Sequence, residues 1–126
     1  MAVMTGYEFR VPVVFAKKSK SRNISDDLYS VEVESFTHGN TNTVVVSKDY
    51  LDAGDRVLIV DDFLATGSAL VGLKALVEMA GGTVVGAGIA VEKAFQGGGD
   101  KLRAQGLRVE SLAKIASMSD DDLIFC

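Results

Sequence analysis

Two neighbouring carboxylates and a glycine loop with two hydroxyl groups lie close together in the stretch RVLIVDDFLATGSAL, residues 56–70. Asp61 and Asp62 follow a run of four apolar residues, and Thr66 and Ser68 flank a glycine just before a helical pattern. A loop that leads into a helix presents backbone N–H groups and the positive end of the helix dipole, which favour an anion such as phosphate. Carboxylates only accept hydrogen bonds, so they suit the hydroxyls of a sugar. The stretch therefore predicts a site for a ribose 5-phosphate.

A purely structural interpretation of the same residues is the alternative. Asp62 or Ser68 would then only cap the helix, and Asp61 would be solvated. For an isolated Asp-Asp pair after a strand, the two interpretations are about equally good. The complete string VLIVDDFLATGSA, with a strand, two acids, a Thr-Gly loop and a helix start in series, favours the ligand site.

The elements that must position these residues can be predicted from the hydrophobic pattern. Continuous apolar runs at 11–16, 56–60 and 83–93 predict strands buried on both faces of a parallel sheet. Residues 69–80 have apolar side chains at helical spacing and are followed by two glycines, which predicts a helix that ends there.

The remaining segments complete an α/β fold. Residues 28–36 alternate between apolar and polar, and together with 43–47 they predict an antiparallel hairpin. Residues 97–106 indicate a loop and a short helix, and 108–115 a final strand before an acidic turn. Strands that alternate with helices predict a largely parallel sheet flanked by helices. Ligands bind such sheets outside the carboxyl ends of the strands, where the two acids are expected.

Composition limits the classes of function. The chain has 126 residues and a net charge of −4, which fits one domain and argues against a nucleic-acid-binding face. No segment approaches the roughly 18 continuous apolar residues of a membrane span. The single cysteine excludes an internal disulfide, and with one histidine it leaves no cluster for structural zinc. We expect a cytoplasmic protein that binds neither nucleic acid nor membrane.

The string VLIVDDFLATGSA resembles the phosphoribosyl-pyrophosphate (PRPP) motif of the type I phosphoribosyltransferases, in which a hydrophobic strand leads into two acids and a short Thr-Gly loop. The segments VPVVFAKKSKS, YSVEVESF, GIAVEKAFQGGGDKL and RVESLAKI are similar to segments of the bacterial xanthine phosphoribosyltransferases, in the same order and at similar spacing. The resemblance covers nearly all 126 residues.

This resemblance implies a purine salvage enzyme that transfers the phosphoribosyl group of PRPP to xanthine or another 6-oxopurine and releases pyrophosphate. It implies that Asp61 and Asp62 are catalytic, because they hold the ribose 2- and 3-hydroxyls beside a sugar that develops positive charge. The Mg²⁺ cofactor is held mainly by the substrate pyrophosphate and water, so no residue is assigned as a metal ligand. The residues implied to hold the 5-phosphate are Ala65, Thr66, Gly67, Ser68 and Ala69.

Lys93 and Phe95 are the candidates for contact with the base. Lys93 ends the predicted strand 83–93, so it should open onto the same sheet edge as the acids. Its ammonium group only donates, which suits the carbonyl oxygen of a 6-oxopurine and not the amino group of adenine. The segment EKAF also resembles the base-contacting segment of the xanthine enzymes, and Phe95 could stack on the base. The alternative is a surface lysine and a core phenylalanine.

The basic residues Lys17, Lys18, Lys20 and Arg22 follow the first predicted strand. They form either a solvated loop or a set of cations that neutralise the pyrophosphate, and Lys17 and Lys18 are assigned to this role.

The predicted hairpin at 28–47 resembles the mobile hood of this fold, which closes over the ligand. His38 lies in its turn and is expected to be exposed rather than catalytic.

In the family, the residues resembling AVMTG lie in a helix that follows a strand and a pyrophosphate-binding loop. We therefore expect residues 1–126 to be a single phosphoribosyltransferase-type domain that lacks its N-terminal helix, first core strand and pyrophosphate loop. By analogy, that strand would lie between the predicted strands 11–16 and 56–60. The backbone groups left unpaired on both neighbours would favour association, and we expect a homodimer.

Other interpretations of the motifs are weaker. VLIVDD also resembles the first strand of a response-regulator receiver, but GIAVEK ends in Glu-Lys where a receiver needs an aspartate. GAGIAV has two glycines of the dinucleotide fingerprint, but it lies within a strand pattern. A non-catalytic PRPP-binding regulator, or an inactive fragment, is the alternative to an enzyme. A sensor needs only the phosphate loop, whereas an enzyme also needs a base-reading residue such as Lys93.

Overall fold

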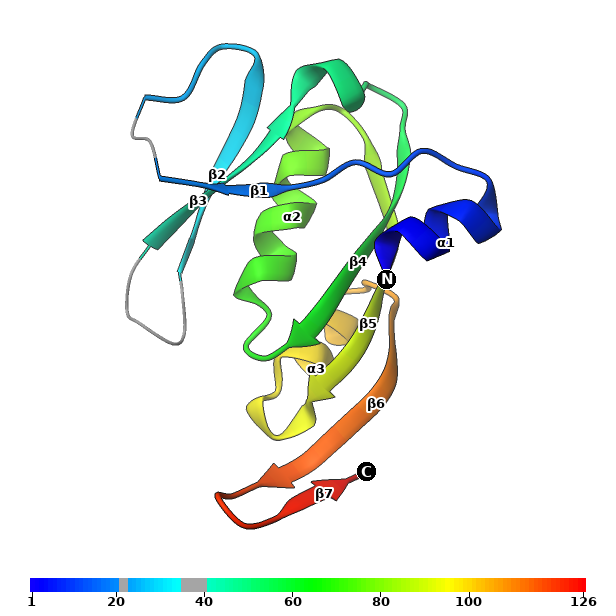
Figure 1. Cartoon of the computed structure of the whole chain (residues 1–126), viewed down its shortest axis with the longest axis vertical. Coiled ribbons are helices and arrows are strands. Elements are labelled where there is room, and N and C mark those ends of the chain that lie inside the picture. Colours follow the sequence, from blue (N-terminus) through cyan, green and yellow to red (C-terminus); the bar gives the residue numbers. More distant parts are fainter. Residues whose placement is uncertain (21–22, 35–40) are drawn as a thin grey trace.

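A computed structural model of the chain describes residues 1–20, 23–34 and 41–126 (Figure 1). These residues form two sheets, which both pack against the helix α2. The helices are α1 (Ala2–Phe9), α2 (Ser68–Met79) and α3 (Gly98–Ala104). The strands are β1 (Lys17–Ser19), β2 (Leu28–Glu34), β3 (Thr41–Ser47), β4 (Arg56–Leu64), β5 (Thr83–Lys93), β6 (Val109–Met118) and β7 (Leu123–Phe125). Short 3-10 turns are η1 (Lys48–Tyr50) and η2 (Ala94–Gln96).

The larger sheet has the strand order β4-β5-β6-β7. Strands β4, β5 and β6 are parallel, with Asp61 beside Ile89 and Leu64 beside Glu92, so β4 and β5 end at the same edge. The predicted α/β fold with a largely parallel sheet is therefore confirmed. Strand β7, which pairs antiparallel with β6, was not predicted because the acidic residues before it indicated a turn.

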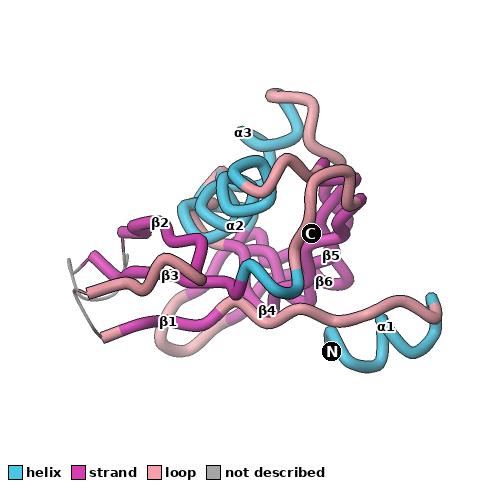
Figure 2. The backbone as a smooth tube through the Cα atoms, turned by 90° about the horizontal axis from the view of Figure 1, so that it is seen from above, coloured by secondary structure: helices cyan, strands magenta, loops and turns pink. Residues whose placement is uncertain are grey.

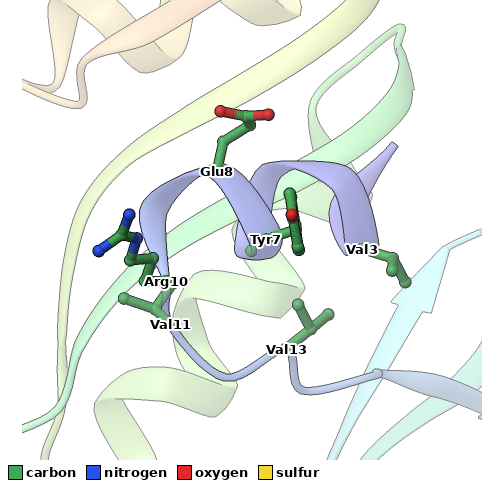
Figure 3. Close-up of a pocket in the computed structure, with 7 residues that line it drawn as sticks. Val3, Tyr7, Glu8, Arg10, Val11 and Val13 are labelled. Atoms are coloured by element: carbon green, nitrogen blue, oxygen red, sulfur yellow. The ribbon is translucent and has the colours of Figure 1, made fainter.

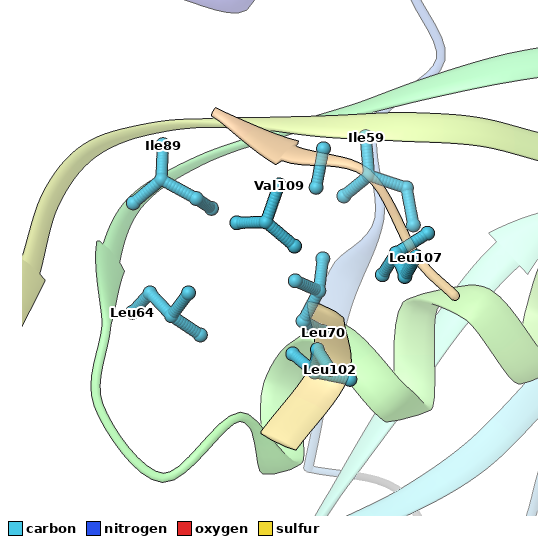
Figure 4. Packing of buried hydrophobic residues seen from close by; sticks show 8 residues of the cluster. Ile59, Leu64, Leu70, Ile89, Leu102, Leu107 and Val109 are labelled. Carbon is cyan, nitrogen blue, oxygen red and sulfur yellow. The ribbon is translucent and has the colours of Figure 1, made fainter. Parts of the chain in front are cut away.

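Figure 2 shows α2 and α3 on one side of the parallel strands and α1 on the other. Apolar side chains from the sheet meet those of α2 and α3 in one buried cluster (Figure 4). Its buried members are Ile59, Leu64, Leu70, Ala87, Ile89, Leu102, Leu107 and Val109. Because Leu64 and Leu70 belong to it, this cluster fixes both ends of the loop between β4 and α2.

The smaller sheet has the strand order β1-β3-β2, and all its pairs are antiparallel. The predicted pairing of 28–36 with 43–47 is confirmed, because Leu28 lies beside Ser47 and Glu34 beside Thr41. Val33 of β2 packs so closely on Gly72 that a side chain at this position of α2 would clash with it. The predicted turn around His38 lies outside the described residues.

The strand predicted at 11–16 is wrong. Arg10 ends α1 in the left-handed conformation, with φ 55°, and the N–H of Val11 donates to the carbonyl of Gly6 over 3.0 Å. Val13 then packs on Gly6, so the apolar run folds back on α1 (Figure 3). Among the described residues, no strand lies beside β4 on the side away from β5. The apolar run therefore joins no sheet.

The strand 83–93 forms with the predicted bounds, whereas the strand predicted at 56–60 continues through the two acids to Leu64. Neither strand is buried on both faces. Leu58 of β4 is 38% exposed and Val85 of β5 is 41% exposed, while Ile59 and Ala87 on the α2 side are buried. Helices α2 and α3 cover one face of these strands, whereas α1 leaves Leu58 and Val85 on the other face partly exposed, so the apolar pattern predicted the strands correctly but their burial only in part. In the described part of the chain, no helix is long and apolar enough to cross a membrane.

Candidate functional site

The two acids lie in the last part of β4, and the strand continues past them to Leu64. Leu64 is only 2% exposed, so it anchors the end of the strand in the core. Gly67 then precedes α2 with φ 91°, a left-handed conformation that favours glycine. Its carbonyl accepts a hydrogen bond from the N–H of Val71 over 2.9 Å, which starts the helix.

The loop between β4 and α2, residues 65–69, is compact. The hydroxyl oxygens of Thr66 and Ser68 lie 3.2 Å apart. Gly67 is the N-cap of α2, and no side chain makes a capping hydrogen bond there. The capping role considered for Asp62 or Ser68 is therefore not seen. The first N–H groups of this twelve-residue helix have no partner within the helix, so the loop can receive an anion.

Asp61 is half-buried, while Asp62 is exposed. An Oδ1 of Asp61 accepts the N–H of Asp62 over 3.0 Å, and Asp62 accepts the N–H of Phe63 over 2.8 Å. Burial raises the pKa of Asp61, and the neighbouring Asp62 carboxylate raises it further, whereas the Lys18 ammonium lowers it. These carboxylates thus accept hydrogen bonds from their own backbone, and the charge of Lys18 in β1 acts on Asp61.

Lys93 is the last residue of β5, at the edge where β4 also ends. Its Nζ lies 5.5 Å from the centroid of the ring of Phe63, which is the residue directly after the two acids in the chain. Phe95, in η2, is 46% exposed, so the core role considered for it is not seen. The structure therefore brings the candidate base residues to the strand end that carries the acids.

Lys17 and Lys18 are exposed residues of β1, where they pair with Val45 and Val44 of β3. Lys18 is the one whose charge acts on Asp61. Lys20 follows β1 and is exposed, while Arg22 lies outside the described residues.

Sequence reasoning missed several residues around the site. Phe63 lies under Lys93, and Glu92 is buried next to it with Arg103 as its partner. The available signals were an aromatic residue directly after the two acids and a single acid inside the apolar strand 83–93. Neither signal identifies the partner residue, because Phe63 meets Lys93 of another strand and Glu92 meets Arg103 of α3.

A separate depression of about 560 Å³ lies at α1 (Figure 3). None of the predicted site residues lines it; its lining is formed by Val3, Gly6, Tyr7, Glu8, Arg10, Val11 and Val13. Among the described residues, no three His, Cys, Asp or Glu side chains gather where they could hold a metal ion.

Comparison with known proteins gives a consistent result. The chain is 52% identical over 124 residues to xanthine phosphoribosyltransferases of Bacillus cereus and Bacillus anthracis. These matches cover 98% of this chain but 63% of each relative, so the chain spans less than two thirds of their length. No protein-family model matches the chain.

Solved structures share the fold. Adenine phosphoribosyltransferase of Thermoanaerobacter pseudethanolicus superposes with a TM-score of 0.75 at 32% identity, over 89% of this chain and 62% of that one. The adenine phosphoribosyltransferase of Trypanosoma brucei, solved with AMP, pyrophosphate and ribose-5-phosphate, superposes with a TM-score of 0.77 over 94% of this chain and 53% of that one. Its sequence identity is 22%, so this likeness shows the fold alone. In sequence and in fold, the chain is therefore similar to phosphoribosyltransferases over the part of their length that it spans.

Proposed function

We propose that this chain binds PRPP and transfers its phosphoribosyl group to xanthine or another 6-oxopurine, as a step of purine salvage. The observation that carries the proposal is the convergence at one sheet edge of half-buried Asp61, the uncapped start of α2 and Lys93. The Bacillus relatives, at 52% identity, are named for the same activity.

The loop 65–69 would bind the 5-phosphate of the phosphoribosyl group, and the two acids would bind its ribose. Backbone N–H groups of the loop and the hydroxyls of Thr66 and Ser68 donate to the 5-phosphate. Asp61 and Asp62 accept hydrogen bonds from the 2- and 3-hydroxyls of the ribose. As the bond from the sugar carbon to pyrophosphate breaks, the sugar ring becomes positively charged. A purine nitrogen bonds to that carbon and loses its proton to water, and pyrophosphate leaves with the bonding electron pair. Two fixed carboxylates stabilise the positive charge of the sugar ring.

The pyrophosphate end needs cations. Lys17 and Lys18 are the candidates, and the effect of the Lys18 charge on Asp61 supports its placement near the sugar. Mg²⁺ fits the acceptor oxygens present, but the described residues offer no three-ligand cluster, so pyrophosphate and water would supply most of its ligands. When bound, the ion neutralises charge on the leaving pyrophosphate.

The base is the point on which the relatives differ. The solved structures named above are adenine enzymes, whereas the Bacillus relatives are named for xanthine. We favour a 6-oxopurine because the Lys93 ammonium can donate to its carbonyl oxygen and cannot accept from an adenine amino group. Phe95, which is exposed and lies two residues after Lys93 in the chain, would stack on the base.

We also propose a cytoplasmic homodimer. The homodimer is supported by the partly exposed apolar residues Leu58 and Val85 on the face of the sheet away from α2 and α3, since exposed apolar surface marks interfaces. Sedimentation velocity at micromolar concentration would test this, and a sedimentation coefficient of a monomer at all concentrations would contradict it.

The experiment for the function is an assay of the chain with PRPP, Mg²⁺ and each of xanthine, guanine, hypoxanthine and adenine. Pyrophosphate release and the nucleotide formed are followed together. We expect transfer to an oxopurine and none to adenine. Transfer to adenine would contradict the role of Lys93. Binding of PRPP without transfer to any base would favour a PRPP-binding regulator instead.

A further inference from the structure

Behind the site lies a buried carboxylate that the proposed function does not use. Glu92 is only 1% exposed and precedes Lys93 at the end of β5. Arg103 of α3 donates to both of its oxygens, with Nη1–Oε1 2.8 Å and Nη2–Oε2 2.6 Å. The hydroxyl of Ser111, on β6, donates to Oε2 over 2.5 Å. One carboxylate therefore joins β5, α3 and β6.

Further contacts fix Arg103 in this position. Its Nε donates to the carbonyl of Val109 over 3.1 Å, and its Nη1 also donates to Asp100 over 3.2 Å. The Lys114 ammonium lies 3.9 Å from Glu92. Chiefly because of Arg103, the pKa of Glu92 falls to about 2, so the carboxylate is charged at neutral pH. A bidentate Arg–carboxylate pair restricts the orientation of both partners.

The start of α3 lies between this carboxylate and the loop 65–69. A side chain at Gly99 would clash with the carboxylate of Glu92, and one at Gly98 would clash with the backbone of Ala65, Thr66 and Gly67. Leu102 also meets the loop, because a Cβ on Gly67 would lie 3.2 Å from its Cδ1. The start of α3 therefore packs directly on the loop, so the position of α3 limits the positions that the loop can take.

We propose that Glu92, through its ion pair with Arg103, is a positioning residue that holds α3 against the loop 65–69 and so sets the loop relative to Lys93. Glu92 is suited to this because it is bonded to Lys93 in the chain and lies beside Leu64, the residue before the loop, in the sheet. The inference rests on the proposed function, since it links the phosphate end of the ligand to the base end. Small misplacements at such a site weaken both binding and reaction.

The test compares Glu92→Gln and Arg103→Lys in the full chain. Glu92→Gln removes the negative charge of the carboxylate. Arg103→Lys keeps the positive charge but loses the bidentate hydrogen bonding of the guanidinium group. Two measurements are made: amide hydrogen exchange of the ligand-free chain, and calorimetric affinity for ribose 5-phosphate. We expect faster exchange in the loop 65–69 and in α3 with unchanged exchange in β2 and β3. We also expect about tenfold weaker binding of ribose 5-phosphate.

Two control variants separate positioning from general stability. Glu110→Gln breaks an exposed pair with Arg108 and should change neither measurement. Val46→Ala, in the buried cluster on the other side of α2, lowers stability without touching the ion pair, and should leave binding within about twofold. Equal losses of affinity in Val46→Ala and Glu92→Gln, at equal loss of Tm, would overturn the inference. The inference would also be overturned if amide hydrogen exchange of the loop 65–69 in both Glu92→Gln and Arg103→Lys were as slow as in the parent chain.

The two hypotheses fail differently. If the parent chain does not bind ribose 5-phosphate, the proposed function is wrong, and the exchange measurement still decides whether Glu92 positions the loop. If the parent binds and Glu92→Gln binds equally well, only the inference about Glu92 is wrong. If Glu92→Gln does not fold, Arg103→Lys, which keeps both charges, decides by the same two measurements.

Discussion

The Lys93 ammonium lies 5.5 Å from the centroid of the Phe63 ring, so the last residue of β5 contacts the residue that follows the acids of β4. A cation over an aromatic ring is held electrostatically. This contact places the candidate base donor over the residue that follows Asp62 in β4.

Lys93→Ala should weaken binding of xanthosine monophosphate and leave the affinity for ribose 5-phosphate unchanged. A hydrogen bond from a charged donor contributes about 1.5–3 kcal/mol, so we expect roughly a 10- to 100-fold loss. Calorimetry with the two ligands measures the difference directly. Lys101→Ala, an exposed lysine of α3, is the matched control and should change neither affinity. Parallel losses for both ligands in Lys93→Ala would contradict a role in reading the base.

Asp61→Asn should make the chain more stable at neutral pH. Burial raises the folded-state pKa of Asp61, so its favourable contribution is present below the unfolded pKa and is lost as pH rises through the folded pKa. At pH 7 the desolvation of the charged group outweighs the favourable hydrogen bond from the Asp62 N–H and the attraction of Lys18, and asparagine removes the desolvation cost. Thermal unfolding should therefore show a higher Tm for Asp61→Asn at pH 7 and a smaller difference at pH 3. Asp26→Asn, an exposed position, should show neither effect. A lower Tm for Asp61→Asn at pH 7 would disprove the burial argument.

Gly67→Ala should abolish phosphate binding at a modest cost in stability. A left-handed conformation costs a residue with a Cβ about 1–2 kcal/mol, and the new Cβ would also press on Leu102. Gly54→Ala is the matched control, because Gly54 has φ 87° and open space around it. Urea unfolding should show a loss of unfolding free energy for both variants, somewhat larger for Gly67→Ala, while calorimetry with ribose 5-phosphate should show lost binding only for Gly67→Ala. Normal binding by Gly67→Ala would exclude the loop as the phosphate site.

The stability of the folded chain should fall at acid pH because Glu92 becomes protonated there. Its folded-state pKa is about 2 against an ordinary value of 4.5, so its contribution is present above about pH 4.5 and is lost as pH falls toward 2. Glu92→Gln should have a lower Tm than the parent at pH 7, and this difference should close as pH falls from 4.5 to 2. Glu110→Gln should follow the parent throughout, since that pair is exposed. A difference between Glu92→Gln and the parent that is constant over this pH range would refute the ion-pair explanation.

Much of the candidate site could be predicted from sequence because its signals are local. The acids, the loop 65–69 and the start of α2 are consecutive, so strand pattern, glycine and helix period predict them together. The strand 83–93 has the bounds expected from its apolar run, and this puts Lys93 at the same edge.

The rest depends on contacts between distant segments. An apolar run becomes a strand only where a neighbouring strand offers hydrogen bonds. In the run 11–16, Val11 and Val13 meet Gly6 of α1 instead. The sequence shows one acid in strand 83–93, but only the fold shows that Glu92 meets Arg103 of α3 and Ser111 of β6. Leu58 is as apolar as Ile59, and only the placement of α2 decides which of the two is buried.

The central claim is that the two acids and the loop 65–69 form a phosphoribosyl site. The most direct measurement is a calorimetric titration of the chain with PRPP and Mg²⁺, beside the double variant Asp61→Asn with Asp62→Asn, whose fold is checked by circular dichroism. We predict binding by the parent chain and loss of binding in a folded variant. Equal binding by both chains, or none by a folded parent, would contradict the claim.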